Sequence, residues 1–148
     1  MKKSDLAIEY FKKNYNCSQS VFTVFGPENG ISEDNCLKIS CAFGAGMGRQ
    51  QYTCGAVTGA LMAIGLKCGK GIDGDNDKKM ITYKKTNEFF SEFKKRHGTI
   101  VCKDLLQGLV MNNPEDAKKI EELRLFETSC LGYVKDAVEI AESLILSK

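Results

Sequence analysis

The stretch from Gly44 to Gly71 constrains the fold of this chain more than any other. It reads GAGMGRQQYTCGAVTGALMAIGLKCGKG and combines many small residues with little charge. From Cys54 onward its apolar residues recur at helical spacing, and Lys67 is the only charged side chain of the helix that this spacing predicts. A helix that is apolar on nearly all sides belongs in the centre of a bundle. Gly55 and Gly59 lie one turn apart, which would let a neighbouring backbone approach closely.

Helical periodicity covers most of the remaining chain, and no strand-like alternation of useful length appears. N-cap residues such as Ser4, Ser32 and Asn113 mark helix starts, and Gly26-Pro27 marks a stop. We therefore predict an all-α fold, a compact bundle of about six to seven helices around the small-residue-rich central helix. The predicted helices cover residues 4–15, 17–25, 32–43, 54–68, 78–97, 113–126 and 130–145, with a short one near residue 102. In the helix over 78–97, the expected core side chains are Met80, Ile81, Tyr83, Phe90 and Phe93.

The composition is that of an ordinary globular protein. With 148 residues, of which 43% are hydrophobic and 27% charged, we expect one domain over residues 1–148 that buries a core without disulfides. The net charge of +2 gives no basis for binding nucleic acid. The N-terminus lacks the apolar core of a signal peptide, and the apolar run over 54–66 is too short to span a bilayer. We expect a cytoplasmic protein that is not an integral membrane protein.

Seven cysteines are many for a chain in a reducing compartment, where they indicate redox or metal chemistry sooner than structural disulfides. Four of them fall in the first turn of a predicted helix: Cys17, Cys54, Cys102 and Cys130. If those helix starts meet at one end of the bundle, their dipoles would favour thiolates there. The other three fall inside helices or at a helix end, where thiols are common packing residues: Cys36, Cys41 and Cys68.

Cys54 is the strongest candidate for a reactive thiol. Thr53 is a suitable N-cap, which would place Cys54 among the unpaired backbone N–H groups of the central helix. Those donors and the helix dipole stabilise an anion, so we expect a lowered pKa at Cys54. By the same logic Ser129 would cap a helix that begins at Cys130.

These motifs resemble the C_GCAxxG_C_C family of redox-active proteins, and the resemblance covers nearly the whole chain. The matching segments are Asn16-Cys17-Ser18-Gln19, Phe43-Gly44-Ala45-Gly46-Met47-Gly48, Cys54-Gly55-Ala56-Val57-Thr58-Gly59, Cys102-Lys103-Asp104-Leu105-Leu106 and Cys130. Thr53 stands where the family name has a glycine before the central cysteine, whereas the CGAxxG form fits fully. The resemblance implies redox activity carried by the same four cysteines, and it supplies no substrate.

Three hypotheses follow. In the first, the protein is a thiol-dependent oxidoreductase or electron carrier: Cys54 attacks as a thiolate, and Cys17, Cys102 or Cys130 resolves the intermediate as a disulfide. In the second, the same four cysteines bind an iron–sulfur cluster or another metal ion such as zinc, although they lack closely spaced pairs. In the third, the chain is a noncatalytic binding or structural module.

The sequence does not specify the redox partner, the substrate or the pairing of the cysteines. A disulfide would require two Cα atoms within roughly 7 Å, and no C-x-x-C motif supplies such a pair locally. Homodimer formation is a further expectation, since the bundle is small and carries a Gly-rich surface loop.

Overall fold

The computed structural model describes residues 1–147, and its helices confirm the predicted all-α fold. Within those residues, the pairing of extended segments is limited to an isolated antiparallel bridge between Thr53 and Val101. The elements in chain order are α1 (Lys3–Lys12), α2 (Cys17–Thr23), η1 (Pro27–Asn29), α3 (Glu33–Cys41), α4 (Gly44–Met47), α5 (Gly55–Cys68), α6 (Asn76–His97), α7 (Cys102–Leu105), α8 (Pro114–Glu122), η2 (Phe126–Cys130) and α9 (Leu131–Leu146).

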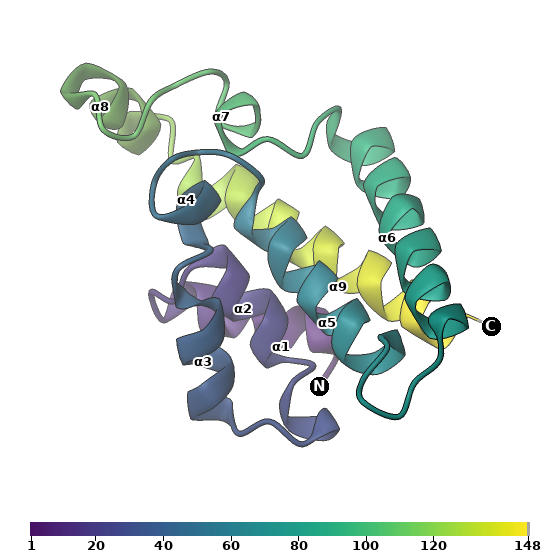
Figure 1. Cartoon of the computed structure of the whole chain (residues 1–148). Coiled ribbons are helices and arrows are strands. Elements are labelled where there is room, and N and C mark those ends of the chain that lie inside the picture. The colour runs from purple at the N-terminus through teal and green to yellow at the C-terminus, as the bar shows by residue number, and fades with distance from the viewer. Residues whose placement is uncertain (148) are drawn as a thin grey trace.

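Helix α5 is the centre of the bundle, as the small-residue stretch predicts. It packs against α2, α6 and α9, and Figure 1 shows α1, α2 and α3 on one side of it and α6 on the other. The α5 side chains that are at most 1% exposed are Ala56, Val57, Ala60, Ala63 and Ile64. A helix lined by such short side chains lets its neighbours come close on several sides.

The buried side chains form two clusters. The main core joins α1, α2, α5, α6 and α9 and includes Val57, Phe89 and Val138. A second core, which consists of Cys102, Leu106, Ile120 and Leu125, lies beneath α7 and α8. In Figure 1, α7 and α8 lie at one end of the bundle, and α8 projects away from the other helices. The four sequence-predicted cysteines lie where these two clusters meet, as described below.

The long helix α6 buries other residues than the sequence pattern predicts. Met80, Ile81 and Tyr83 are 58%, 49% and 55% exposed, so their expected place in the core is wrong. Residues 76–84 of α6 are largely exposed, whereas Phe89 and Phe93 further along the helix are fully buried. Their rings stack with centroids 5.9 Å apart.

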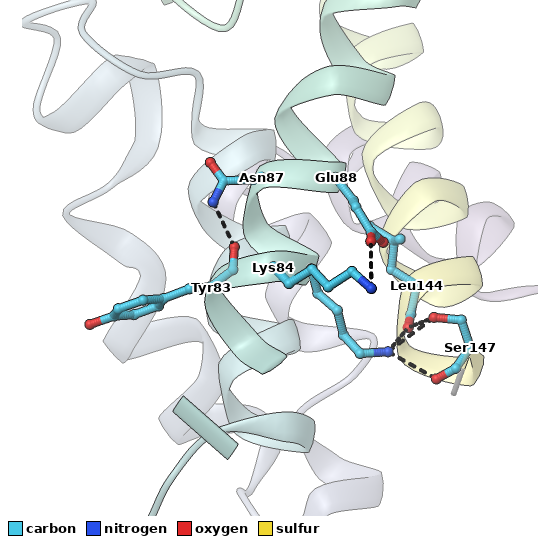
Figure 2. Close-up of polar contacts among 7 residues, drawn as sticks. Tyr83, Lys84, Asn87, Glu88, Leu144 and Ser147 are labelled. Atoms are coloured by element: carbon cyan, nitrogen blue, oxygen red, sulfur yellow. Dashed lines mark hydrogen bonds and ion pairs between the residues drawn. The ribbon is translucent and has the colours of Figure 1, made fainter. Parts of the chain in front are cut away.

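Lys85 on α6 holds the C-terminal end of α9. Its Nζ donates hydrogen bonds to the carbonyl oxygen of Leu144, to that of Ser147 at 2.9 Å and to Ser147 Oγ at 3.0 Å. Figure 2 shows the Leu144 and Ser147 oxygens converging on this contact, beside the exposed pair of Lys84 and Glu88. Since the last carbonyls of a helix have no partner within it, Lys85 both satisfies them and joins the two helices.

Candidate functional site

Cys17 is the first residue of α2, where the sequence places it. Asn16 forms a capping box with Gln19: each side chain accepts a hydrogen bond from the backbone N–H of the other, both at 2.9 Å. Asn16 Nδ2 also donates to the carbonyl oxygen of Cys41 at 2.9 Å, which fixes the start of α2 against the end of α3. The backbone that carries Cys17 is therefore held by its own cap and by a neighbouring helix.

Two glycines of α5 bring α2 close to it. A Cβ atom at Gly55 would lie 2.6 Å from Cys17 Sγ, and one at Gly59 would lie 2.8 Å from the carbonyl oxygen of Ser18. Both distances are too short for any side chain. The close backbone approach that the glycine spacing predicts is thus confirmed, and at Gly55 it serves to seat the sulfur of Cys17 against the start of α5.

Element α4 is a left-handed turn that covers the same sulfur. Five consecutive residues have positive φ: Ala45 (+53°), Gly46 (+65°), Met47 (+71°), Gly48 (+61°) and Arg49 (+69°). A left-handed conformation costs a residue other than glycine about 1–2 kcal/mol, so the turn is strained at three positions. It directs the backbone N–H of Ala45 toward the Cys17 sulfur, which is a contact that favours a thiolate.

Cys54 and Cys102 lie on adjacent segments. The Cys54 N–H donates to the carbonyl oxygen of Ile100 at 2.7 Å, and the Cys102 N–H donates to that of Tyr52 at 2.6 Å. Cys54 is the N-cap of α5 rather than part of its first turn, which corrects the predicted cap at Thr53. Cys102 begins the short helix α7, as expected.

Cys130 does not begin a helix. It is the last residue of the π-helical turn η2, and the chain continues from it into α9 without leaving helical geometry. The predicted cap at Ser129 is therefore wrong, because the backbone N–H of Cys130 already donates to the carbonyl oxygen of Leu125. A π-helical turn inserts one residue into a helix and redirects the side chains around it.

Cys17 and Cys54 shift each other's pKa in opposite directions. A hydrogen bond from the Cys54 thiol lowers the pKa of Cys17 to about 6, with the N–H groups of Ala45, Cys17 and Ser18 acting in the same direction against the effect of burial. The same hydrogen bond, burial and the charge of Cys17 raise the pKa of Cys54 well above its usual range. The expected lowered pKa at Cys54 is wrong, because the pKa is lowered at Cys17 and raised at Cys54.

The pKa values of Cys102 and Cys130, which lie near Cys17, are both raised. Burial, followed by the charge of Cys17, raises the pKa of Cys102 to about 12. Burial, followed by the charges of Cys17 and Cys102, also raises the pKa of Cys130. These shifts favour one thiolate, on Cys17, among three protonated thiols near neutral pH.

A cavity of about 930 Å³ is lined by Cys17, Cys54, Cys102 and Cys130. The four cysteines come from α2, the start of α5, α7 and η2, so residues far apart in the sequence share one space between the main core and the second core. Cys54 and Cys102 are only 5% and 7% exposed, whereas Cys17 and Cys130 are partly exposed. The cavity is large enough to admit a small molecule.

The side chains of the described residues do not form a metal-binding group. Among residues 1–147, no three His, Cys, Asp or Glu side chains are grouped so that they could hold one metal ion. The four cysteines thus line one cavity without the convergence that an iron–sulfur cluster or zinc ion would need. The second hypothesis gains no support from this geometry and stays a prediction.

The sequence pattern of the family described as "Putative redox-active protein (C_GCAxxG_C_C)" matches residues 15–144. The chain belongs to this family. Neither a curated protein nor a solved structure matches it. The family match spans all four cavity cysteines and the glycine-rich approach to Cys54. None of the helices in residues 1–147 combines the length and apolar composition that crossing a membrane requires.

Several residues of the cavity are absent from the sequence-based predictions. Ala45 lies near Cys17 only because α4 is left-handed, and no local pattern indicates that conformation. Tyr133 on α9 also lines the cavity, and its hydroxyl donates to the carbonyl oxygen of Leu105 at 2.9 Å. The signal that could have indicated Arg49 is its place five residues before Cys54, next to the glycine cluster.

Proposed function

We propose that this protein is a thiol–disulfide oxidoreductase in which Cys17 is the nucleophile and Cys54 the resolving cysteine. The contact between a lowered-pKa Cys17 and a protonated Cys54 carries the proposal. A thiolate beside a thiol is the arrangement that a reduced dithiol needs before it reacts. The roles are the reverse of those that the sequence-based hypothesis gives to these residues.

The reaction begins at the sulfur of Cys17. Its thiolate attacks one sulfur of a substrate disulfide R–S–S–R′, so that a Cys17–R mixed disulfide forms and R′S⁻ leaves. The R′S⁻ anion takes the proton of Cys54. The Cys54 thiolate then attacks Cys17 Sγ, which forms the Cys17–Cys54 disulfide and releases RS⁻. The substrate gains two electrons and the protein loses two, and a dithiol reductant reverses the reaction.

The donors around Cys17 suit its role as attacking and as leaving sulfur. The N–H groups of Ala45, Cys17 and Ser18 surround a charge that disappears when Cys17 attacks and returns when it is reduced. A low thiol pKa also makes Cys17 the better leaving group when the Cys17–Cys54 disulfide is reduced. Cys102 and Cys130 line the same cavity as a second pair of thiols, both protonated and slower to react.

Trapping the mixed disulfide tests this assignment. Reduced protein is treated with hydroxyethyl disulfide, and the products are identified by intact mass and peptide mapping. The wild type should lose two thiols without retaining the reagent, because Cys54 displaces it. Cys54→Ser should retain one reagent molecule on Cys17, and Cys17→Ser should react far more slowly.

Cys41→Ser is the matched control because Cys41 is exposed and lies outside the cavity. It should behave as the wild type does. The proposal fails if Cys54→Ser still releases the reagent through Cys102 or Cys130, or if Cys17→Ser reacts at the wild-type rate. Stoichiometric iron and sulfide in anaerobically purified protein would instead favour the cluster hypothesis.

A further inference from the structure

The cavity carries more positive than negative side chains. Lys12, Arg49 and Arg124 line it, against the single carboxylate of Glu127. Within residues 1–147, none of these three cations forms an ion pair with an acidic side chain. They approach the cavity from different parts of the chain: the end of α1, the second residue after α4 and the segment after α8. An anion that enters the cavity would therefore meet cations from several directions.

Backbone strain is concentrated around the same cavity. Seven residues other than glycine have positive φ in the described part of the chain, and four of them line the cavity: Asn14, Ala45, Arg49 and Arg124. Arg49 and Arg124 have φ values of +69° and +53°. Residues held in such conformations cluster at binding sites, because the surrounding structure compensates their cost only where position matters. Both arginines of the cavity are held in this way.

The walls of the cavity favour a small ligand with an apolar body. Aromatic rings of Phe11, Tyr15, Phe126 and Tyr133 line it. Its volume of about 930 Å³ is that of a small-molecule pocket. Cys17, which attacks first, is only partly exposed and faces this cavity. A small molecule can enter the cavity and reach it more readily than a disulfide on the rigid surface of a folded protein.

We infer that the cavity binds a small organic disulfide that has an apolar or aromatic body and carries at least one carboxylate or phosphate group. This inference rests on the proposed function, because it names the substrate class of the same reaction. Arg49, Arg124 and Lys12 bind the anionic group, the aromatic rings contact the body, and the disulfide bond lies at Cys17. The exchange then proceeds as above, with the substrate disulfide as the oxidant.

Two aromatic disulfides that differ in charge test the inference. Dithiobis(nitrobenzoate) carries carboxylates, and dithiodipyridine is neutral, and both release a coloured thiol. The rate constant of each reagent with reduced protein is measured, and the value for the anionic reagent is divided by the value for the neutral one. This ratio is then divided by the ratio that the same two reagents give with N-acetylcysteine. We expect the normalised ratio to favour the anionic reagent by about tenfold at low salt and to fall as ionic strength rises.

The variants locate the effect. Arg49→Gln with Arg124→Gln should remove most of the preference for the anionic reagent, measured as the normalised ratio of the two rate constants. Arg49→Lys keeps the charge and should retain most of the preference, which separates loss of charge from damage to the fold. Lys79→Gln is the matched control, since Lys79 is an exposed cation on α6 that does not line the cavity.

The outcomes separate this inference from the proposed function. If Cys17 reacts readily with both reagents at a normalised ratio near one, the substrate class is wrong and the oxidoreductase proposal stands. If Cys17 reacts with neither reagent, the proposed function itself fails. An unchanged ratio in the double arginine variant would also overturn the inference, whatever the wild-type value.

Discussion

At the scale of single residues, the molecule stabilises one negative charge among several thiols. Cys17 has a lowered pKa, so its thiolate is lost only as pH falls through about 6. The ionised Cys17 stabilises the folded protein most fully above the unfolded thiol pKa of about 8.5. This stabilisation is lost as the pH falls through the folded pKa of about 6. The pKa of Cys54 is raised, so the protonated Cys54 stabilises the folded protein at lower pH. This stabilisation is lost as the pH rises. Near neutral pH the pair is therefore one thiolate and one thiol.

Gly55 is the residue on which the position of Cys17 most directly depends. Gly55→Ala would place a methyl group 2.6 Å from Cys17 Sγ and 3.1 Å from both the Phe43 carbonyl oxygen and the Ser18 nitrogen. We expect a loss of about 1–3 kcal/mol in the free energy of unfolding, because the start of α5 must move away from α2. Cys17 should also react more slowly with iodoacetamide near neutral pH. Urea unfolding and alkylation rates measure the two effects.

Gly65→Ala is the matched control on the same helix. Nothing lies within 4 Å of a Cβ atom at Gly65. This variant should be more stable by about 0.5–1 kcal/mol, because alanine has the higher helix propensity, and Cys17 should react as in the wild type. Equal stability changes in the two variants would contradict the role given to Gly55.

At the scale of elements, the helices follow from local sequence far better than the site does. The expected helix start at Cys17 is capped by Asn16 and Gln19, and the small residues of α5 give the expected central helix, because each depends on neighbours in the sequence. The distribution of charge depends on contacts between elements. Cys54 lies at the start of α5, as its N-cap, yet its pKa rises because of its hydrogen bond with Cys17, its burial and the charge of Cys17.

The left-handed turn α4 shows why local reasoning stops short of the site. Its glycines indicate an irregular loop, but Ala45, Met47 and Arg49 disfavour positive φ, so the sequence alone gives no reason to expect a left-handed turn. Packing overrides that preference: a Cβ atom at Gly46 would lie 2.5 Å from the Cα atom of Gln51, so the turn closes tightly on the segment before Cys54. Positions set by tertiary contacts of this kind cannot be read from residue spacing.

At the scale of the whole molecule, α6 is joined to α9 at two separate places. Near its C-terminal end, His97 Nε2 lies 2.8 Å from Asp136 Oδ2, and Phe93 is buried. In the N-terminal half of α6, Lys85 donates hydrogen bonds to the last carbonyls of α9. The two helices are therefore also joined at the end of the molecule that is remote from the cysteines. The stability of this end and the chemistry of the cavity should therefore be separable.

Neighbouring lysines provide a test of that separation. Lys85→Ala should lower the free energy of unfolding by about 1–3 kcal/mol, because it removes charge-assisted hydrogen bonds between the buried Lys85 side chain and the end of α9. Lys84→Ala removes only an exposed pair with Glu88 at 3.9 Å and should cost at most about 0.5 kcal/mol. Denaturant unfolding compares them, and the alkylation rate of Cys17 should be unchanged in both. Equal costs, or altered Cys17 reactivity in Lys85→Ala, would be inconsistent with this view.

The central claim is that Cys17 is a thiolate because Cys54 donates a hydrogen bond to it. The measurement is the rate of Cys17 alkylation by iodoacetamide as a function of pH, located by peptide mapping, in the wild type and in Cys54→Ala. We predict a half-maximal rate at a pH of about 6 in the wild type and a clear shift to higher pH in the variant. A wild-type midpoint in the ordinary thiol range, or the same midpoint in both proteins, would contradict the claim.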